Sequence, residues 1–229
     1  MEQSFWFERW SEGRIGFHEQ GGNRRLHEHW QAFVSRYGPK PASSPGRVLV
    51  PLCGKSTDLR WLAARGHEVV GVEFIEAAAE AFFRESGVEP ERTQEAGAIR
   101  YRHRAISIIV ADFFALPELT VGSIDLIYDR AALVAVAPER RAQYLEQLAR
   151  LSQPQAGLFL VTFEHDSGSG PPFSIADTPQ LLSSHFDSVE RIAEHDILEA
   201  EPRFRERGAS SMLEVVWFAR RLATPAPAT

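Results

Sequence analysis

From Arg47 onward the sequence alternates short apolar runs with stretches of helical periodicity, and this alternation restricts the chain to few architectures. Residues 48–50 and 68–73 are apolar runs typical of buried strands, and between them apolar side chains recur at helical spacing over 57–65. A strand, a helix and a second strand in this order predict a βαβ unit with two parallel strands.

The same alternation continues almost to the end of the chain. Further strands are expected over 106–110, 124–128, 157–163, 186–193 and 212–218, and further helices over 76–86, 138–151 and 179–185. We therefore expect an α/β fold, with a doubly wound, mostly parallel sheet and helices on both of its faces.

The segment before this alternation favours helix. Asn23 is a suitable cap for a helix with apolar residues at helical spacing, and Gly38 ends that helix. The linker 38–46 is rich in Pro, Ser and Gly. With 229 residues, 44% of them hydrophobic, we expect one domain. Its parts are an N-terminal helical segment over 1–38, a core over 47–222 and a loose tail over 223–229.

Charge and hydropathy exclude two classes of partner. The net charge is -6, from 25 Lys and Arg against 31 Asp and Glu, so the chain lacks the basic character that binds nucleic-acid phosphates. No apolar stretch approaches the ~20 residues of a membrane-spanning helix, and the N-terminus lacks the pattern of a signal peptide. We expect a soluble protein with no nucleic-acid or membrane partner.

Cysteine and histidine usage indicates the compartment and argues against a metal. Cys53 is the one cysteine, so it cannot form an intramolecular disulfide, and we expect a cytoplasmic protein. His27 and His29 are two positions apart in an expected helix and point to different faces, unlike the i, i+4 pair of a helix-borne metal site. We expect no metal ion, and we expect a monomer.

The loop after the first strand, 51–57, resembles a phosphate-binding loop only in part. Gly54, Lys55 and Ser56 fit a P-loop, but Leu49 stands where that motif needs its first glycine. Leu52 likewise occupies the position of a second glycine in the dinucleotide-binding fingerprint. The loop is therefore not suited to phosphate recognition.

An acidic residue follows at the distance expected for a ribose-binding group. Glu73 ends the second strand, 19 residues beyond Gly54, and a carboxylate there can accept the two ribose hydroxyls of an adenosine. S-adenosylmethionine fits such a site, because it contains adenosine and ribose but no phosphate. Alternatively, Glu73 caps the helix that begins near Glu76, and Gly54 merely turns the chain.

Two further strand ends carry charged side chains. Asp112 directly follows the third strand and precedes Phe113, so the acid can accept the adenine amino group while an aromatic ring covers the base. A cap followed by core aromatics is the alternative. Asp129 and Arg130 end the fourth strand, where side chains are expected to face a ligand.

Several stretches together resemble a known family. The chain carries WFERW at 6–10, GFHE at 16–19, PLCGKS at 51–56, YDRAALVA at 128–135 and GPPF at 170–173. These stretches resemble the thiopurine S-methyltransferase family, bacterial branch, within the class I S-adenosylmethionine-dependent methyltransferases. The resemblance covers nearly the whole chain. It implies a Rossmann-like, seven-stranded sheet whose last strand is antiparallel, and an N-terminal helical lid over the cofactor.

The resemblance also implies roles for particular residues. Trp10 covers the cofactor from the lid, Leu52 and Gly54 contact it through their backbone, and Glu73 holds its ribose. Asp112 and Phe113 frame the adenine. Arg130 lies between cofactor and acceptor, as both a cofactor-binding and a catalytic residue. The C-terminal arginines Arg203, Arg205 and Arg207 lie where the family supplies acceptor-side arginines, without a choice among them.

The implied activity is methyl transfer from S-adenosylmethionine to the sulfur of aromatic or heterocyclic thiols such as thiopurines, with S-adenosylhomocysteine as product. Arg130 favours the reacting thiolate, and the aromatic residues of the lid, Phe5, Trp6, Trp10 and Phe17, suit a flat apolar acceptor. Two alternatives are another small nucleophile (halide, sulfide, or a selenium or tellurium species) and a noncatalytic sensor of adenosine ligands.

Structural interpretations remain open for three of these features. Trp6 and Trp10, at i and i+4, are on one helix face and could simply pack on the core. The segment 203–207 could be a solvated edge strand. Cys53 is expected to be a small buried residue, because methyl transfer needs no covalent enzyme intermediate.

Overall fold

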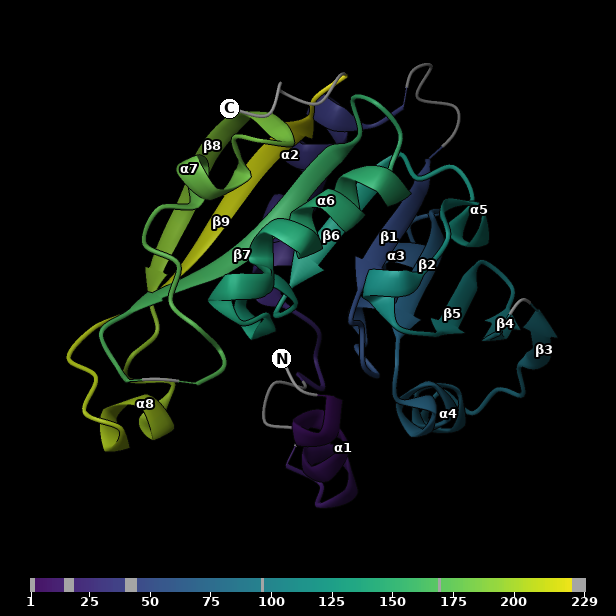
Figure 1. Ribbon diagram of the computed structural model, residues 1–229, viewed down its shortest axis with the longest axis horizontal. Helices are drawn as coiled ribbons and strands as arrows, with labels where there is room; N and C mark the ends of the chain where they lie inside the picture. Colours follow the sequence, from purple (N-terminus) through teal and green to yellow (C-terminus); the bar gives the residue numbers. More distant parts are fainter. Residues whose placement is uncertain (1–2, 15–18, 40–44, 96, 169, 224–229) are drawn as a thin grey trace.

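The computed structural model describes residues 3–14, 19–39, 45–95, 97–168 and 170–223. Within these residues the strands form one nine-stranded sheet of order β3-β4-β5-β2-β1-β6-β7-β9-β8 (Figure 1). The strands are β1 (Arg47–Pro51), β2 (Glu68–Glu73), β3 (Glu91–Glu95), β4 (Ala98–His103), β5 (Ile106–Val110), β6 (Leu126–Arg130), β7 (Gly157–His165), β8 (Phe186–Asp196) and β9 (Met212–Arg221).

The centre of the sheet is parallel and its margins are antiparallel. Strands β5, β2, β1, β6 and β7 pair in parallel, and the last strand, β9, runs antiparallel between β7 and β8. The expected mostly parallel sheet with an antiparallel last strand is therefore confirmed. The expected count of seven strands is too low by two, because β3 and β4 form an antiparallel hairpin beside β5. Strand β3 (ERTQE) consists of polar and charged residues, and β4 (AIRYRH) mixes polar and apolar residues, so neither has the long apolar run of a central strand.

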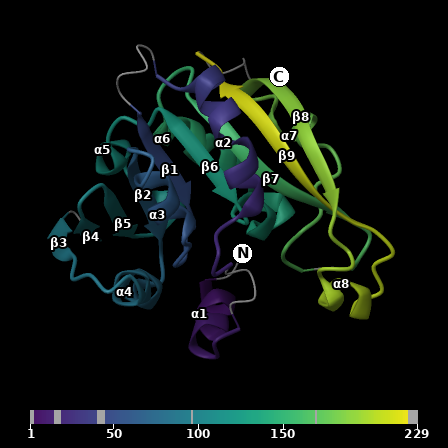
Figure 2. The same cartoon turned by 180° about the vertical axis from the view of Figure 1, so that it is seen from behind.

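Helices cover both faces of the sheet. One face carries α2 (Arg24–Tyr37), α3 (Asp58–Ala63) and α4 (Glu76–Glu85), whose apolar residues join one buried cluster. The opposite face carries α5 (Glu118–Val121), α6 (Arg141–Leu151) and α7 (Thr178–Leu182), whose residues belong to a second cluster. Figure 2 shows α2 lying across β7 and β9 on the first face. This arrangement confirms the doubly wound fold.

Helix α2 is built as its sequence predicts and packs unusually close to the sheet. The Asn23 side chain accepts a hydrogen bond from the N–H of Leu26 at 3.1 Å, which caps the helix. Gly157 of β7 lies under the helix, and a Cβ atom there would come within 2.5 Å of the Tyr37 Cβ and 3.0 Å of the Phe33 Cζ. Glycine at this position therefore allows the close contact between α2 and β7.

Two helices lie at the edge where the parallel strands end. Figures 1 and 2 both show α1 (Gln3–Ser11) and α8 (Pro202–Glu206) on this side of the sheet. The possible edge strand over 203–207 is therefore wrong: Pro202 starts a short helix there, and Phe204 is buried in the core. No helix within the described ranges is long and apolar enough to cross a bilayer.

Candidate active site

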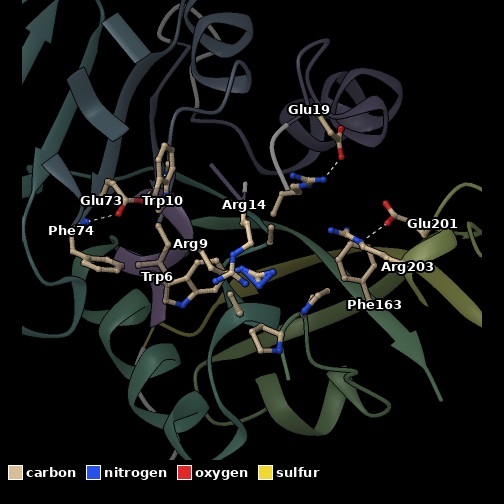
Figure 3. A pocket seen from close by; sticks show the side chains of 17 residues that line it. Trp6, Arg9, Trp10, Arg14, Glu19, Glu73, Phe74, Phe163, Glu201 and Arg203 are labelled. Atoms are coloured by element: carbon tan, nitrogen blue, oxygen red, sulfur yellow. Dashed lines mark hydrogen bonds and ion pairs between the residues drawn. The ribbon is translucent and has the colours of Figure 1, made fainter. Parts of the chain in front are cut away.

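A cavity opens at the carboxyl ends of the parallel strands, between the sheet and the helices α1 and α8 (Figure 3). Its walls come from α1, from the loops after β1, β2 and β6, from β7, and from the segment around α8. Ligands of open parallel sheets bind at this edge. Seven residues singled out in the sequence line it: Trp6, Trp10, Leu52, Gly54, Glu73, Arg130 and Arg203.

The backbone turns sharply where β1 and β6 end. Leu52 and Ala131 have positive φ angles, 46° and 65°, and both line the cavity. Left-handed backbone is uncommon for residues other than glycine and gathers at functional sites. Gly54 also has a positive φ, of 53°. These turns expose main-chain groups of neighbouring strand ends to one cavity.

Glu73 is a buried acid with a nearly complete set of hydrogen-bond donors. The residue is 4% exposed, and its carboxylate accepts from the N–H groups of Gly54 (2.9 Å), Phe74 (2.8 Å) and Ile75 (2.9 Å). Burial raises the pKa of Glu73 above its usual value, while the three N–H groups lower it. A carboxylate offers about four acceptor positions, so about one remains for a ligand.

This geometry unites the two interpretations of Glu73. The bonds to Phe74 and Ile75 hold the chain where it enters α4, as a cap does, because Ile75 is the N-cap residue of that helix. The bond to Gly54 fixes the loop after β1. The carboxylate nevertheless lines the cavity, so the structural role leaves room for a binding role.

Arg130 also lines the cavity and forms an ion pair with Glu19. The arginine side chain is only 15% exposed. Burial raises the pKa of Glu19, and the nearby Arg130 lowers it. The main-chain oxygen of Glu19 accepts from the Thr57 hydroxyl at 3.1 Å. The chain before α2 is thus attached to the ends of β6 and the loop before α3, next to the cavity.

Asp129, the neighbour of Arg130, was expected to face the ligand, but it does not line the cavity. Its carboxylate accepts from the Tyr144 hydroxyl at 2.7 Å and from the Leu133 N–H at 3.1 Å, on the α6 side of the sheet. Adjacent residues of a strand point to opposite faces, so Arg130 and Asp129 cannot both face the ligand. Burial raises the pKa of Asp129 to about 6.

Helix α1 contributes aromatic and cationic side chains to the cavity. Trp6 and Trp10 are half-buried, line the cavity and are not among the buried core residues, which argues against simple core packing. The Phe5 ring meets that of Trp6 edge-on at 5.2 Å. Phe7, 50% exposed, contacts the ring of Phe74. The predicted lid residue Phe17, with Gly16 and His18, lies outside the described residues.

Asp112 and Phe113 border a smaller adjoining cavity, which shares Trp6, Leu52 and Phe74 with the larger one. Asp112 accepts from the Phe114 N–H at 3.0 Å and caps the short turn η1 (Phe113–Ala115), as its structural interpretation predicted. The Phe113 side chain is 1% exposed and packs on Tyr144. The neighbouring aromatic residue, Phe114, is half-buried and also borders this smaller cavity.

Two arginines that line the cavity, Arg9 and Arg14, were not predicted from the sequence. Figure 3 shows Arg9 and Arg14 in the middle of the cavity, with Glu73 and Trp10 on one side and Arg203 on the other. Burial lowers the pKa of Arg9, and its neighbours Arg14 and Arg203 lower it further. Arg9 lies within the WFERW stretch, for which the resemblance implied no arginine role, and Arg14 lies outside the quoted stretches, so their position in space is what identifies them.

Two remaining expectations have clear outcomes. Of the three candidate arginines, Arg203 lines the cavity and pairs with Glu201 at 2.8 Å, whereas Arg205 and Arg207 are not part of the lining. Cys53 is buried, as expected, and burial holds the pKa of its thiol well above the usual value. A thiol in this state is a poor nucleophile.

The sheet order and the site together define a class of protein. Strands β5-β2-β1-β6-β7-β9-β8, with β9 antiparallel and a ligand-facing acid at the end of β2, form the class I S-adenosylmethionine-dependent methyltransferase fold. Residues 1–222 match the thiopurine S-methyltransferase family. The chain belongs to this family.

Relatives and solved structures agree with this assignment. A thiopurine S-methyltransferase of Pseudomonas putida is 40% identical over 220 residues, covering 95% of this chain and 98% of that protein. One from Xanthomonas euvesicatoria is 40% identical over 222 residues, covering 95% and 98%. The fold is similar to Burkholderia thailandensis 1,6-didemethyltoxoflavin-N1-methyltransferase, crystallised with S-adenosylhomocysteine (TM-score 0.61, 16% identity, 96% of this chain and 86% of that chain).

Proposed function

We propose that this chain is an S-adenosylmethionine-dependent methyltransferase that methylates the sulfur of aromatic or heterocyclic thiols such as thiopurines. The observation that carries the proposal is a cavity in which a buried acid, Glu73, and a half-buried arginine, Arg130, face one ligand space in a member of this family. Bound S-adenosylmethionine supplies a methyl group already activated on a sulfonium sulfur.

The residues of the cavity fit this cofactor. Glu73 keeps about one acceptor position for a ribose hydroxyl. Leu52 and Gly54 offer backbone groups, and Trp10 offers an aromatic face from α1. Asp112, with Phe113 beside it, borders the adjoining cavity, where an adenine amino group would find an acceptor.

Arg130 binds the cofactor side and acts on the acceptor in this proposal. A fixed guanidinium beside a thiol favours the thiolate and lowers the pKa of that thiol. Its partner Glu19 holds the guanidinium in place through an ion pair. A heteroaryl thiol is already acidic, so the protein mainly supplies proximity, alignment and exclusion of water.

The N-terminal segment acts as a lid in this proposal. Helix α1 lines the cavity with Trp6 and Trp10, and none of its residues 4–11 is among the buried core residues. A helix with this few core contacts can open and close at low cost, and its rings suit a flat, apolar acceptor.

The experiment is a turnover assay with methyl-labelled S-adenosylmethionine and a panel of acceptors. We expect labelled thioether from heteroaryl thiols, and far less product from the matched compounds with oxygen in place of sulfur. Faster turnover of halide, sulfide, selenite or tellurite would favour the small-nucleophile alternative. Binding of S-adenosylhomocysteine without turnover of any acceptor would favour the sensor.

Three further expectations belong to this proposal. The chain forms one domain, with a lid segment over 1–38, a core over 47–222 and a tail over 223–229. It works in the cytoplasm, and it is a monomer. Light scattering at micromolar concentration checks that the chain is a monomer. Limited proteolysis checks the division into segments, because cleavage is expected in the linker 38–46 before the core is cleaved.

A further inference from the structure

A second cluster of ligating side chains lies away from the cavity, between α2 and the edge strand β8. Glu28 and His29 come from α2, and His195 comes from β8. One ligand atom of each residue lies within 4.8 Å of the others. The His29 Nε2 is 4.0 Å from the Glu28 Oε2. Tetrahedral Zn²⁺ with ligands at about 2.0–2.2 Å brings them roughly 3.4 Å apart, so small side-chain rotations suffice.

Both imidazoles have an unused ring nitrogen at this place. The Nε2 atoms of His29 and His195 are buried and have no hydrogen-bond partner among the residues that the structure describes. Buried polar atoms are normally paired. Two unpaired imidazole nitrogens beside a carboxylate make this cluster a candidate metal site.

We propose that Glu28, His29 and His195 bind one Zn²⁺ ion that joins α2 to β8. Two imidazoles and one carboxylate are a donor set that Zn²⁺ uses, and the fourth position of the tetrahedron is open to water. The ion would fix the outermost strand of the sheet, β8, to the helix that covers this face. This inference is independent of the proposed function.

Two arginines of α2, Arg24 and Arg25, donate hydrogen bonds to the Glu28 carboxylate.

Arg24 and Arg25 do not block the site. Arg24 donates to the Glu28 Oε1 at 2.6 Å, which leaves the Oε2 atom for the ion. Arg25 donates to that Oε2 at 3.2 Å, but its shorter bond, 2.8 Å, goes to Glu214 of β9. Glu28 can therefore turn its Oε2 toward the ion while Arg25 keeps its partner on the sheet.

The test is calorimetric titration of the full-length, tag-free, chelator-treated chain with ZnCl₂. We expect one ion per chain. His29→Ala and His195→Ala, on two different elements, are each expected to weaken binding more than about 100-fold, beyond the ~10–100-fold cost of losing an outer-sphere partner. His27→Ala, on the same helix but outside the cluster, is the matched control and is expected to bind like the parent.

A thermal melt gives an independent readout. An ion that binds only the folded chain raises its melting temperature, so Zn²⁺ is expected to shift the parent and His27→Ala upward and the two cluster variants much less. Absence of one-to-one binding by the parent would overturn the proposal. So would cluster variants that bind Zn²⁺ as tightly as His27→Ala.

Discussion

Glu73, at the end of β2, accepts a hydrogen bond from the N–H of Gly54 in the loop after β1, with a distance of 2.9 Å between Oε2 and nitrogen. The acid thus holds the shape of the loop that lines the cavity, in addition to any contact with a ligand. A substitution at Glu73 therefore changes both the loop and the binding site, and an experiment must separate the two effects.

Glu73→Gln is expected to weaken S-adenosylhomocysteine binding by roughly 1.5–3 kcal/mol, or about 10–150-fold, the range for a hydrogen bond to a charged group. The substitution preserves side-chain shape but replaces one acceptor by a donor, which no longer accepts from a ribose hydroxyl. Calorimetry measures the change.

A ligand without the ribose 2′-hydroxyl distinguishes contact from loop distortion. The parent is expected to bind 2′-deoxy-S-adenosylhomocysteine more weakly than the natural ligand, whereas Glu73→Gln discriminates little between the two. If parent and variant lose the same factor on removal of the hydroxyl, Glu73 does not contact the ribose and only supports the loop.

Arg130→Ala is expected to lower kcat/KM for a heteroaryl thiol by about 10–150-fold below the pKa of that thiol. The loss shrinks as pH rises above this pKa, because the acceptor then ionises without help from a cation. Arg130→Lys keeps the charge but not the planar fork, so it is expected to retain more activity than alanine.

The control for this series is Arg205→Ala, which removes an exposed arginine of α8 outside the cavity lining. It is expected to have the activity of the parent at every pH. A pH profile of Arg130→Ala that runs parallel to the parent throughout would show that Arg130 does not stabilise the thiolate.

The raised pKa of Asp129 leads us to expect that the free energy of unfolding depends on pH. Its pKa in the folded chain is about 6, against 3.8 for the ordinary group, so between these values the folded chain holds a proton that the unfolded chain has lost. The free energy of unfolding therefore falls as pH rises from about 4 to about 6. The difference of about two pKa units corresponds to roughly 3 kcal/mol.

Asp129→Asn removes this titration and is measured by urea unfolding at several pH values. Relative to the parent, the variant is expected to gain up to about 3 kcal/mol of stability between pH 4 and pH 7. Asp187→Asn, at an exposed position of β8, serves as the control. A stability difference between parent and Asp129→Asn that stays constant with pH would contradict the prediction.

The lid proposal predicts ligand-dependent protection of α1. Hydrogen exchange over residues 3–14 is expected to slow on S-adenosylhomocysteine binding, while exchange in β1 changes little. Deleting residues 1–20 is expected to abolish turnover and leave the sheet folded, because residues 4–11 of α1 are not among the buried core residues. Equal protection with and without ligand would indicate that α1 is a fixed part of the fold.

Local patterns in the sequence determined most of the secondary structure. The predicted boundaries of β2, 68–73, agree with the structure, and Asn23 caps α2 as expected. Helix periodicity and capping depend on residues within four positions of one another, so they can be read from the sequence. The hairpin of β3 and β4 was missed, because strands near the sheet margin need no continuous apolar run.

The part of the candidate site that lies within one βαβ unit could also be predicted from the sequence. Gly54 and Glu73 belong to one βαβ unit, so their spacing alone placed both at the same sheet edge. Conversely, strand alternation decides that Arg130 faces the cavity and Asp129 does not. Two adjacent charged residues in a sequence carry no sign of which one faces the ligand.

Tertiary structure decided the contacts between distant segments. Arg130 meets Glu19 across 111 positions, and His29 of α2 meets His195 of β8. Such pairs depend on the order of the strands in the sheet and on which face of the sheet each helix covers. Strand order and helix placement follow from the burial of apolar surface over the whole chain, so a short stretch of sequence does not determine them.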